Sequence, residues 1–284
     1  MNKILVPYDF SDVALHALNF AADLARKVKE HCTVNLINVI EHPTPDTIKT
    51  MGIVDYDPME AVYIKQMMIT MEEKMKALMA DAKYKDIDLN YKIVLGQPFH
   101  EITNEITTTG VELVVMGTSG VSGAEEFLVG SNAERMVRYS KCPVITLSEE
   151  SNVSSVQDIV FASNFYEVPA SFVEHIKRLQ AAFDAELKIV KINTPASFTT
   201  TRHDMKQMSN FVEKFDLKNY SLDIYNHTNE EDGIVAYAED MGADLIALGT
   251  NQRRGVGHFI NGSIAEDVVN HSKIPVWTFG LDAE

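Results

Sequence analysis

Short runs of apolar and β-branched residues alternate along the chain with longer stretches in which apolar residues recur every three or four positions. The short runs are typical of buried strands and the longer stretches of amphipathic helices, so their alternation predicts parallel strands with helices on both faces. Predicted strands of the first half cover 3–7, 33–40, 89–95, 111–116 and 143–147. Helical patterns lie between them at 12–29, 58–84, 98–108 and 131–140. The second half repeats the pattern, with predicted strands at 157–162, 186–192, 220–226, 243–248 and 275–279.

The two halves are related by an internal repeat. When the sequence is shifted by 132 residues, the segment 110–147 pairs with 242–279 without a gap, and 16 of the 38 pairs are identical. The beginnings of the halves also correspond, since residues 4–10 match 159–165. A repeat of this kind indicates two copies of one folding unit.

We therefore predict an α/β fold of two tandem, five-stranded, parallel-sheet α/β/α domains of the Rossmann-like class. The first domain is expected to cover residues 1–149 and the second 156–284. The stretch between them is short and polar, as is typical of a linker.

Charge and composition exclude several partners. The net charge is −16, and so acidic a surface disfavours nucleic acid and anionic lipid. No stretch reaches the roughly 18 apolar residues of a membrane span, and the first residues do not resemble a signal peptide, so we expect a cytoplasmic protein with no membrane partner. Cys32 and Cys142 lie in apolar runs, which predicts buried, reduced thiols rather than a disulfide or a metal site.

A glycine pattern follows the fourth predicted strand of the first half. Gly117 ends that strand, Gly120 lies three residues further on, and after nine more residues Gly130 and Ser131 begin a helix. Ligands of doubly wound sheets bind beyond the carboxyl ends of the strands, and glycines let them approach the backbone. Because a helix N-terminus attracts anions through its N–H groups and its dipole, the pattern predicts a phosphate-binding site.

The first strand ends at the same edge of the sheet, in Pro7, Tyr8 and Asp9. The carboxylate of Asp9 is therefore expected near the phosphate-binding loop. It can contact a ligand, cap the N-terminus of the following helix together with Ser11, or do both.

The opening residues 4–11, the glycine pattern and the closing residues 140–145 together resemble the universal stress protein family, and Gly96 after the third strand is consistent with it. The resemblance covers both halves, as in tandem members of the family, whose domains have an adenine nucleotide alpha hydrolase-like fold. It implies ATP binding without an established reaction. By this resemblance Asp9 is the acidic residue after the first strand and the backbone of Val39 recognises adenine. The ribose and phosphate loop then consists of Gly117, Gly120, Gly130, Ser131 and Asn132.

The resemblance also implies a partner for the last strand of each domain. Family members pair two domains across these strands, so 143–147 is expected beside 275–279 in an intrachain pseudo-dimer. The methionine-rich helical pattern at 58–84 offers a surface for a further homodimer, and the segment 41–67 is a candidate lid or interface.

The phosphate loop lacks basic residues. Between Thr118 and Val129 there is no Lys or Arg, whereas Glu125 and Glu126 are acidic. Phosphate charge must then be balanced by backbone amides, the helix dipole and a divalent cation, so we expect modest, Mg²⁺-assisted ATP binding. Arg135, one turn into the helix, is a further candidate, although a solvent-facing role is the simpler interpretation. No catalytic residue and no metal-ligand set can be assigned from the spacing of the side chains.

The second half departs from the pattern. Asn164 replaces Asp9, Gln252 replaces Gly120, and no glycine follows the third strand. The residues of this second site are Asn164, Gly249, Gln252, Arg253, Arg254, Gly262 and Ser263. A degenerate site is the simplest interpretation, and a site adapted to a different anion is the alternative.

These observations favour a stress-response protein that binds ATP or another adenine nucleotide in its first domain and acts as a nucleotide-dependent regulatory or interaction module. Two alternatives stay open at this point. One is an interaction protein that binds no nucleotide, and the other is a weak ATPase. The signatures of nucleotide-hydrolysing P-loops are absent, so we do not expect an enzyme.

Overall fold

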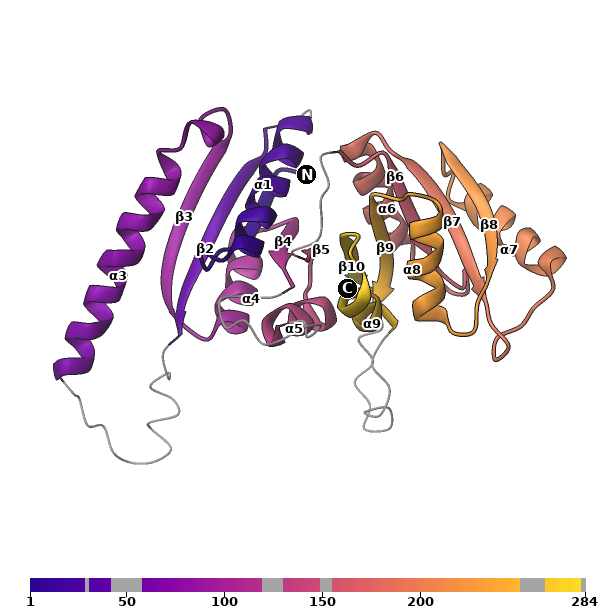
Figure 1. Ribbon diagram of the computed structural model, residues 1–284. Coiled ribbons are helices and arrows are strands. Elements are labelled where there is room, and N and C mark those ends of the chain that lie inside the picture. The colour runs from indigo at the N-terminus through magenta and orange to yellow at the C-terminus, as the bar shows by residue number, and fades with distance from the viewer. Residues whose placement is uncertain (29–30, 42–57, 119–129, 149–154, 251–263, 282–284) are drawn as a thin grey trace.

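The computed structural model describes residues 1–28, 31–41, 58–118, 130–148, 155–250 and 264–281. Its centre is one ten-stranded sheet to which each half of the chain contributes five strands (Figure 1). The strands of the first half are β1 (Lys3–Pro7), β2 (Thr33–Glu41), β3 (Asp88–Gly96), β4 (Leu113–Gly117) and β5 (Val144–Leu147). Its helices are α1 (Asp12–Lys27), α3 (Pro58–Met79), α4 (Pro98–Thr109) and α5 (Ser131–Tyr139).

The second half has the same order of elements. Its strands are β6 (Asp158–Ala162), β7 (Glu186–Asn193), β8 (Tyr220–Asn226), β9 (Leu245–Thr250) and β10 (Val276–Gly280). Its helices are α6 (Ala170–Phe183), α7 (Thr201–Lys214), α8 (Glu230–Asp240) and α9 (Ile264–His271). Within each half all strand pairs are parallel, so the predicted α/β architecture with parallel five-stranded units is confirmed.

The order of strands in the sheet is β3-β2-β1-β4-β5-β10-β9-β6-β7-β8. The order reverses direction between β1 and β4 in the first half and between β6 and β9 in the second, and such reversals are where ligands bind in open α/β sheets. The two halves meet at the antiparallel pair β5–β10, as expected for an intrachain pseudo-dimer.

The joint between the halves is tightly packed. Trp277 lies opposite Ile145 in the ladder, and both side chains are at most 1% exposed. The Thr146 hydroxyl donates to the carbonyl of Val276. On the outer face, the guanidinium of Arg138 on α5 forms a two-point ion pair with Glu266 on α9, a buried carboxylate. The sheet and the ion pair between α5 and α9 therefore both connect the two halves.

The helices cover both faces of the sheet because each helix packs against it through apolar residues. Residues of α1, α3, α6 and α7 pack on one face of the sheet and share a core that runs through both halves. On the other face, α4 and α5 cover the first half, and α8 and α9 cover the second. Figure 1 shows α5 and α9 side by side where the halves meet.

The helix predicted over 58–84 is shorter than expected. It ends at Met79, and a 3₁₀ turn follows at Ala82–Tyr84 because the side chain of Asp81 accepts a hydrogen bond from the amide of Lys83 and caps that turn. Met75 is fully buried, whereas Met68 is 36% exposed. Residues 42–57, which include most of the candidate lid, lie outside the described residues.

Candidate functional site

A cavity of about 610 Å³ opens at the carboxyl ends of β1, β2 and β4 in the first half. Its walls come from these strand ends and from the first residues of α4 and α5. Of the nine residues predicted for the first site, eight line this cavity: Pro7, Tyr8, Asp9, Val39, Gly117, Gly130, Ser131 and Asn132. The ninth, Gly120, lies outside the described residues. The fold thus brings together residues that are more than 100 positions apart in the sequence.

The end of β1 forms a fixed turn. The amide of Tyr8 donates to the carbonyl of Ile37, and Phe10 has a positive φ of 67°. A carboxylate oxygen of Asp9 accepts hydrogen bonds from the amide of Ser11 at 3.0 Å and from its hydroxyl at 2.6 Å. The N-cap of α1 is Ser11, whose hydroxyl accepts from the amide of Ala14. Asp9 is therefore not the cap itself but the residue that orients it.

The start of α5 is anchored to the end of β4. The amide of Gly130 donates to the carbonyl of Thr118 at 2.6 Å, so this N–H group is engaged within the protein rather than open to a ligand. Gly130 is the N-cap of α5 and has no side chain to cap the helix. The next three residues, Ser131, Asn132 and Ala133, line the cavity with the first helical turn. A helix end without a side-chain cap at the edge of a cavity is a favourable place for an anion.

The opposite wall of the cavity is apolar and ends in a carboxylate. Alternate residues of β2, namely Ile37, Val39 and Glu41, line it, together with Ile102 and Met116. Glu41 is not among the residues predicted for the site, although its position two residues after Val39 places it on the same face of the strand. The apolar residues of the wall are not among them either, because in the sequence they are indistinguishable from ordinary core positions.

The charged side chains of the described lining are both acidic, namely Asp9 and Glu41. Burial, and after it the nearby charge of Asp9, raises the pKa of the Tyr8 hydroxyl, which therefore stays protonated at neutral pH. Arg135 is exposed and does not line the cavity; its guanidinium stacks over the ring of Phe99, 4.1 Å from the ring centre. His100 is likewise exposed and outside the lining.

In the described residues of the second half, a protein side chain occupies part of the corresponding region. Asn164 keeps the turn of Asp9, since its side-chain oxygen accepts from the amide of Tyr166, but it lacks the negative charge. The side chain of Leu281 covers Gly249, with its nearest atom 2.8 Å from where a Cβ of Gly249 would lie. The other residues predicted for this site, Gln252, Arg253, Arg254, Gly262 and Ser263, lie outside the described residues.

The two halves also differ beneath the third strand of each. In the first half, Gly96 has a φ of 154° and the side chain of Glu101 on α4 packs directly against it. In the second half the glycine is on the helix instead: Gly233 of α8 lies against the side chains of His227 and Ile192, at 2.8 and 2.6 Å from its Cβ position. The glycine of this contact lies at the strand end in the first half and on the helix in the second. As a result, α8 approaches β7 closely enough to bury Ile192 to 7% exposure.

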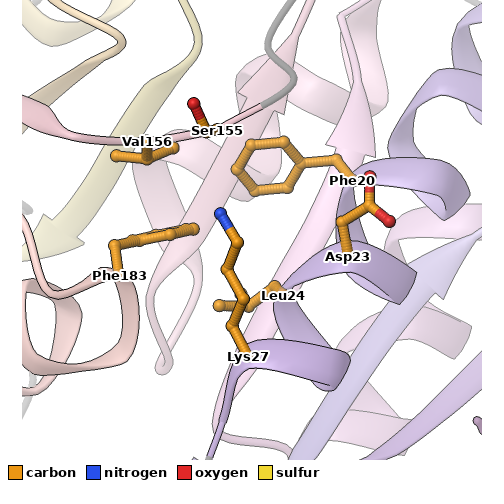
Figure 2. A pocket seen from close by; sticks show the side chains of 7 residues that line it. All are labelled: Phe20, Asp23, Leu24, Lys27, Ser155, Val156 and Phe183. Atoms are coloured by element: carbon orange, nitrogen blue, oxygen red, sulfur yellow. The ribbon is translucent and has the colours of Figure 1, made fainter.

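A second hollow lies between the halves, on the α1 and α6 face of the sheet. Figure 2 shows the Lys27 side chain pointing into the space between the rings of Phe20 and Phe183. The volume is about 10 Å³, which holds roughly one water molecule. This hollow belongs to the packing of the joint and is too small for a ligand.

Both cysteines are free and buried, as predicted. Burial raises the pKa of the Cys142 thiol to about 11, which keeps it protonated and unreactive at neutral pH. Within the described ranges, no three His, Cys, Asp or Glu side chains are grouped so that they could hold a metal ion. None of the described helices combines the length and the apolar composition that crossing a membrane requires.

Comparison with known proteins gives consistent matches. The model of the universal stress protein family matches residues 1–148 and 224–279. Universal stress protein YxiE of Bacillus subtilis is 30% identical over 148 residues, which are 51% of this chain and 97% of that protein. The crystal structure of a universal stress protein from Archaeoglobus fulgidus covers 98% of this chain and 96% of its own, with a TM-score of 0.72 and 22% identity. A putative universal stress protein from Pseudomonas aeruginosa covers 99% of this chain and 93% of its own, with a TM-score of 0.63 and 14% identity.

Proposed function

The chain belongs to the universal stress protein family, and on that premise we propose that its first half binds an adenine nucleotide and acts as a nucleotide-dependent regulatory or interaction module. The observation that supports this most is the cavity at the end of β1, β2 and β4. It combines an uncapped helix N-terminus on one side with an apolar wall on the other. A nucleotide likewise has two different ends, an anionic phosphate that suits the helix N-terminus and an aromatic base that suits the apolar wall.

The proposed arrangement follows from the walls. The phosphate lies at the first turn of α5, where the backbone N–H groups of Ser131 and Asn132 and the helix dipole favour an anion. The ribose lies near Asp9 at the end of β1, and the base lies against Ile37 and Ile102. The proposal is for a binding module rather than an enzyme, because the described lining contains no nucleophile paired with a general base.

Replacing Ser131 by glutamate is a direct test of the phosphate position. Acidic residues are favoured in the first turn of a helix, so Ser131→Glu preserves the fold, but its charge repels a phosphate at that turn. We expect isothermal titration calorimetry to show at least about a tenfold loss of AMP and ATP affinity, equivalent to about 1.4 kcal/mol. Ser131→Ala, the matched control, loses much less. Equal affinity of the wild type and Ser131→Glu would exclude a phosphate at α5.

The acidic lining predicts an unusual dependence on divalent cations. Asp9 and Glu41 oppose the charge of a free triphosphate, so ATP should bind as its Mg²⁺ complex. Of the two carboxylates, Asp9 is nearer to the expected phosphates, because β1 lies next to β4 and β2 lies further out. Removing Mg²⁺ with a chelator is expected to lower ATP affinity about tenfold and to leave AMP affinity unchanged. In chelator, ATP affinity should rise with added KCl, because salt screens the repulsion. Falling ATP affinity with salt would show that cationic groups dominate the site.

The second half is proposed to be a closed structural partner. Leu281 covers Gly249, and α8 lies directly on Ile192, the residue that matches Val39 in strand register. Among the described residues, protein atoms therefore occupy the end of β9 and the base side of a second site. The calorimetric titration described above should accordingly give one nucleotide per chain.

A further inference from the structure

The order of the strands determines which end of a bound ligand lies at which strand. From the joint outward, the strand ends that line it follow the order β4, β1 and β2. The first turn of α5 is tied to the β4 end by the hydrogen bond from Gly130 to Thr118. A phosphate at that turn therefore places the other end of the ligand at β2. The chemistry at the end of β2 thus determines which base the cavity accepts.

Glu41 is the last residue of β2 and is held at a defined place. It pairs in register with Gly96, at the end of a nine-residue parallel ladder between β2 and β3. It follows Ile37 and Val39 on the same face of the strand, so its carboxylate stands at the outer end of the apolar wall. Glu101 lies near the same strand ends, but its side chain packs against Gly96 and does not line the cavity.

We infer that Glu41 is a specificity-determining residue that recognises the amino group of the base; the inference rests on the proposed nucleotide site. An ionised carboxylate only accepts hydrogen bonds. It binds an N–H group of a base through a charge-assisted hydrogen bond and repels a ring nitrogen or carbonyl oxygen in the same place. The preferred ligand class is therefore a nucleotide whose base carries an exocyclic amino group, and adenine is the base to which we commit.

Two nucleotides isolate this contact. AMP and purine riboside 5′-monophosphate differ only in the 6-amino group, so the ratio of their affinities measures its recognition. We expect the wild type to prefer AMP about tenfold, since a hydrogen bond to a charged group contributes about this much. Glu41→Ala should bring the ratio close to one by weakening AMP, and should leave the affinity for purine riboside monophosphate unchanged or slightly higher. Glu41→Gln, which keeps an acceptor oxygen but not the charge, should give an intermediate ratio.

Glu101→Ala is the matched control, because it removes a carboxylate at the same edge of the sheet but outside the cavity. Its ratio should equal that of the wild type. If the wild type binds AMP but Glu41→Ala retains the wild-type ratio, the role of Glu41 is wrong while the proposed function stands. If the wild type binds neither nucleotide, the proposed function itself fails. A wild-type preference for GMP over AMP would overturn the proposed adenine site and, with it, the assignment of Glu41 to the 6-amino group.

Discussion

Replacing Lys191 by methionine is expected to lower the free energy of unfolding by about 3–5 kcal/mol, the largest effect that we predict for a single charged residue. Lys191 on β7 is 5% exposed, and its ammonium group lies 2.6 Å from the carboxylate of Asp204 on α7, which is fully buried. Thr199 donates a hydrogen bond to the same carboxylate. Removing the lysine leaves a negative charge in the core, where neither water nor a cation compensates for it.

Urea denaturation of three variants separates this effect from the loss of any lysine. Lys218→Met removes a cation from the exposed pair with Asp216, so it should change stability by less than about 1 kcal/mol. The double variant Lys191→Met/Asp204→Leu removes both buried charges and should recover most of the loss. A Lys191→Met protein as stable as Lys218→Met would show that the buried pair contributes no more to stability than the exposed one.

Truncating Trp277 to alanine is expected to cost about 3–5 kcal/mol as well, because it opens a cavity at the joint of the two halves. The indole packs against Phe172 and Phe279, with ring centres 5.6 and 6.3 Å away, and lies opposite Ile145 in the β5–β10 ladder. The loss should appear in the unfolding of the whole chain, since the core on this face runs through both halves.

Phe198→Ala provides the comparison, because this ring is 69% exposed and its removal should change the unfolding midpoint by little. Trp277→Phe should retain part of the stability, since it keeps an aromatic ring at the joint. If Trp277→Ala unfolds at the same urea concentration as Phe198→Ala, the packing of the Trp277 side chain contributes nothing to the stability of the joint. Tryptophan fluorescence cannot follow the Trp277 variants, because Trp277 is the one Trp of the chain, so circular dichroism is used for all of them.

Much of the architecture could be predicted because each half repeats simple local patterns. Apolar runs located the strands to within about two residues, and the glycine pattern located the turn where Gly117 ends β4 and the helix that begins at Ser131. The pairing of β5 with β10 came from the family resemblance, since periodicity alone does not select a partner for a strand. The residues at 119–129, on which part of the phosphate loop depends, lie outside the described ranges, so the role of Gly120 stays a prediction.

The residues that sequence reasoning missed act through contacts that no local pattern encodes. Lys191 lies in a strand, where a lysine ordinarily indicates a solvent-facing position, and its partner is the buried Asp204 on a helix. Leu281 comes after the last strand and meets Gly249 across the β9–β10 ladder. Glu41 differs, because the period of two along β2 places it on the face of Val39 and would have identified it.

In the Gly96–Glu101 contact the glycine lies at the strand end, and in the His227–Gly233 contact it lies on the helix. This difference affects how a second binding site could be engineered. A single substitution that copies the first half, such as Gln252→Gly, changes the loop but leaves α8 on Ile192 and Leu281 on Gly249. The helix cannot retreat unless a side chain at 233 pushes it away from β7, and His227 must then become small to admit that side chain. The two halves therefore differ at pairs of contacting residues. A working graft must transfer the residues at the end of β8, the facing first turn of α8 and Leu281 together.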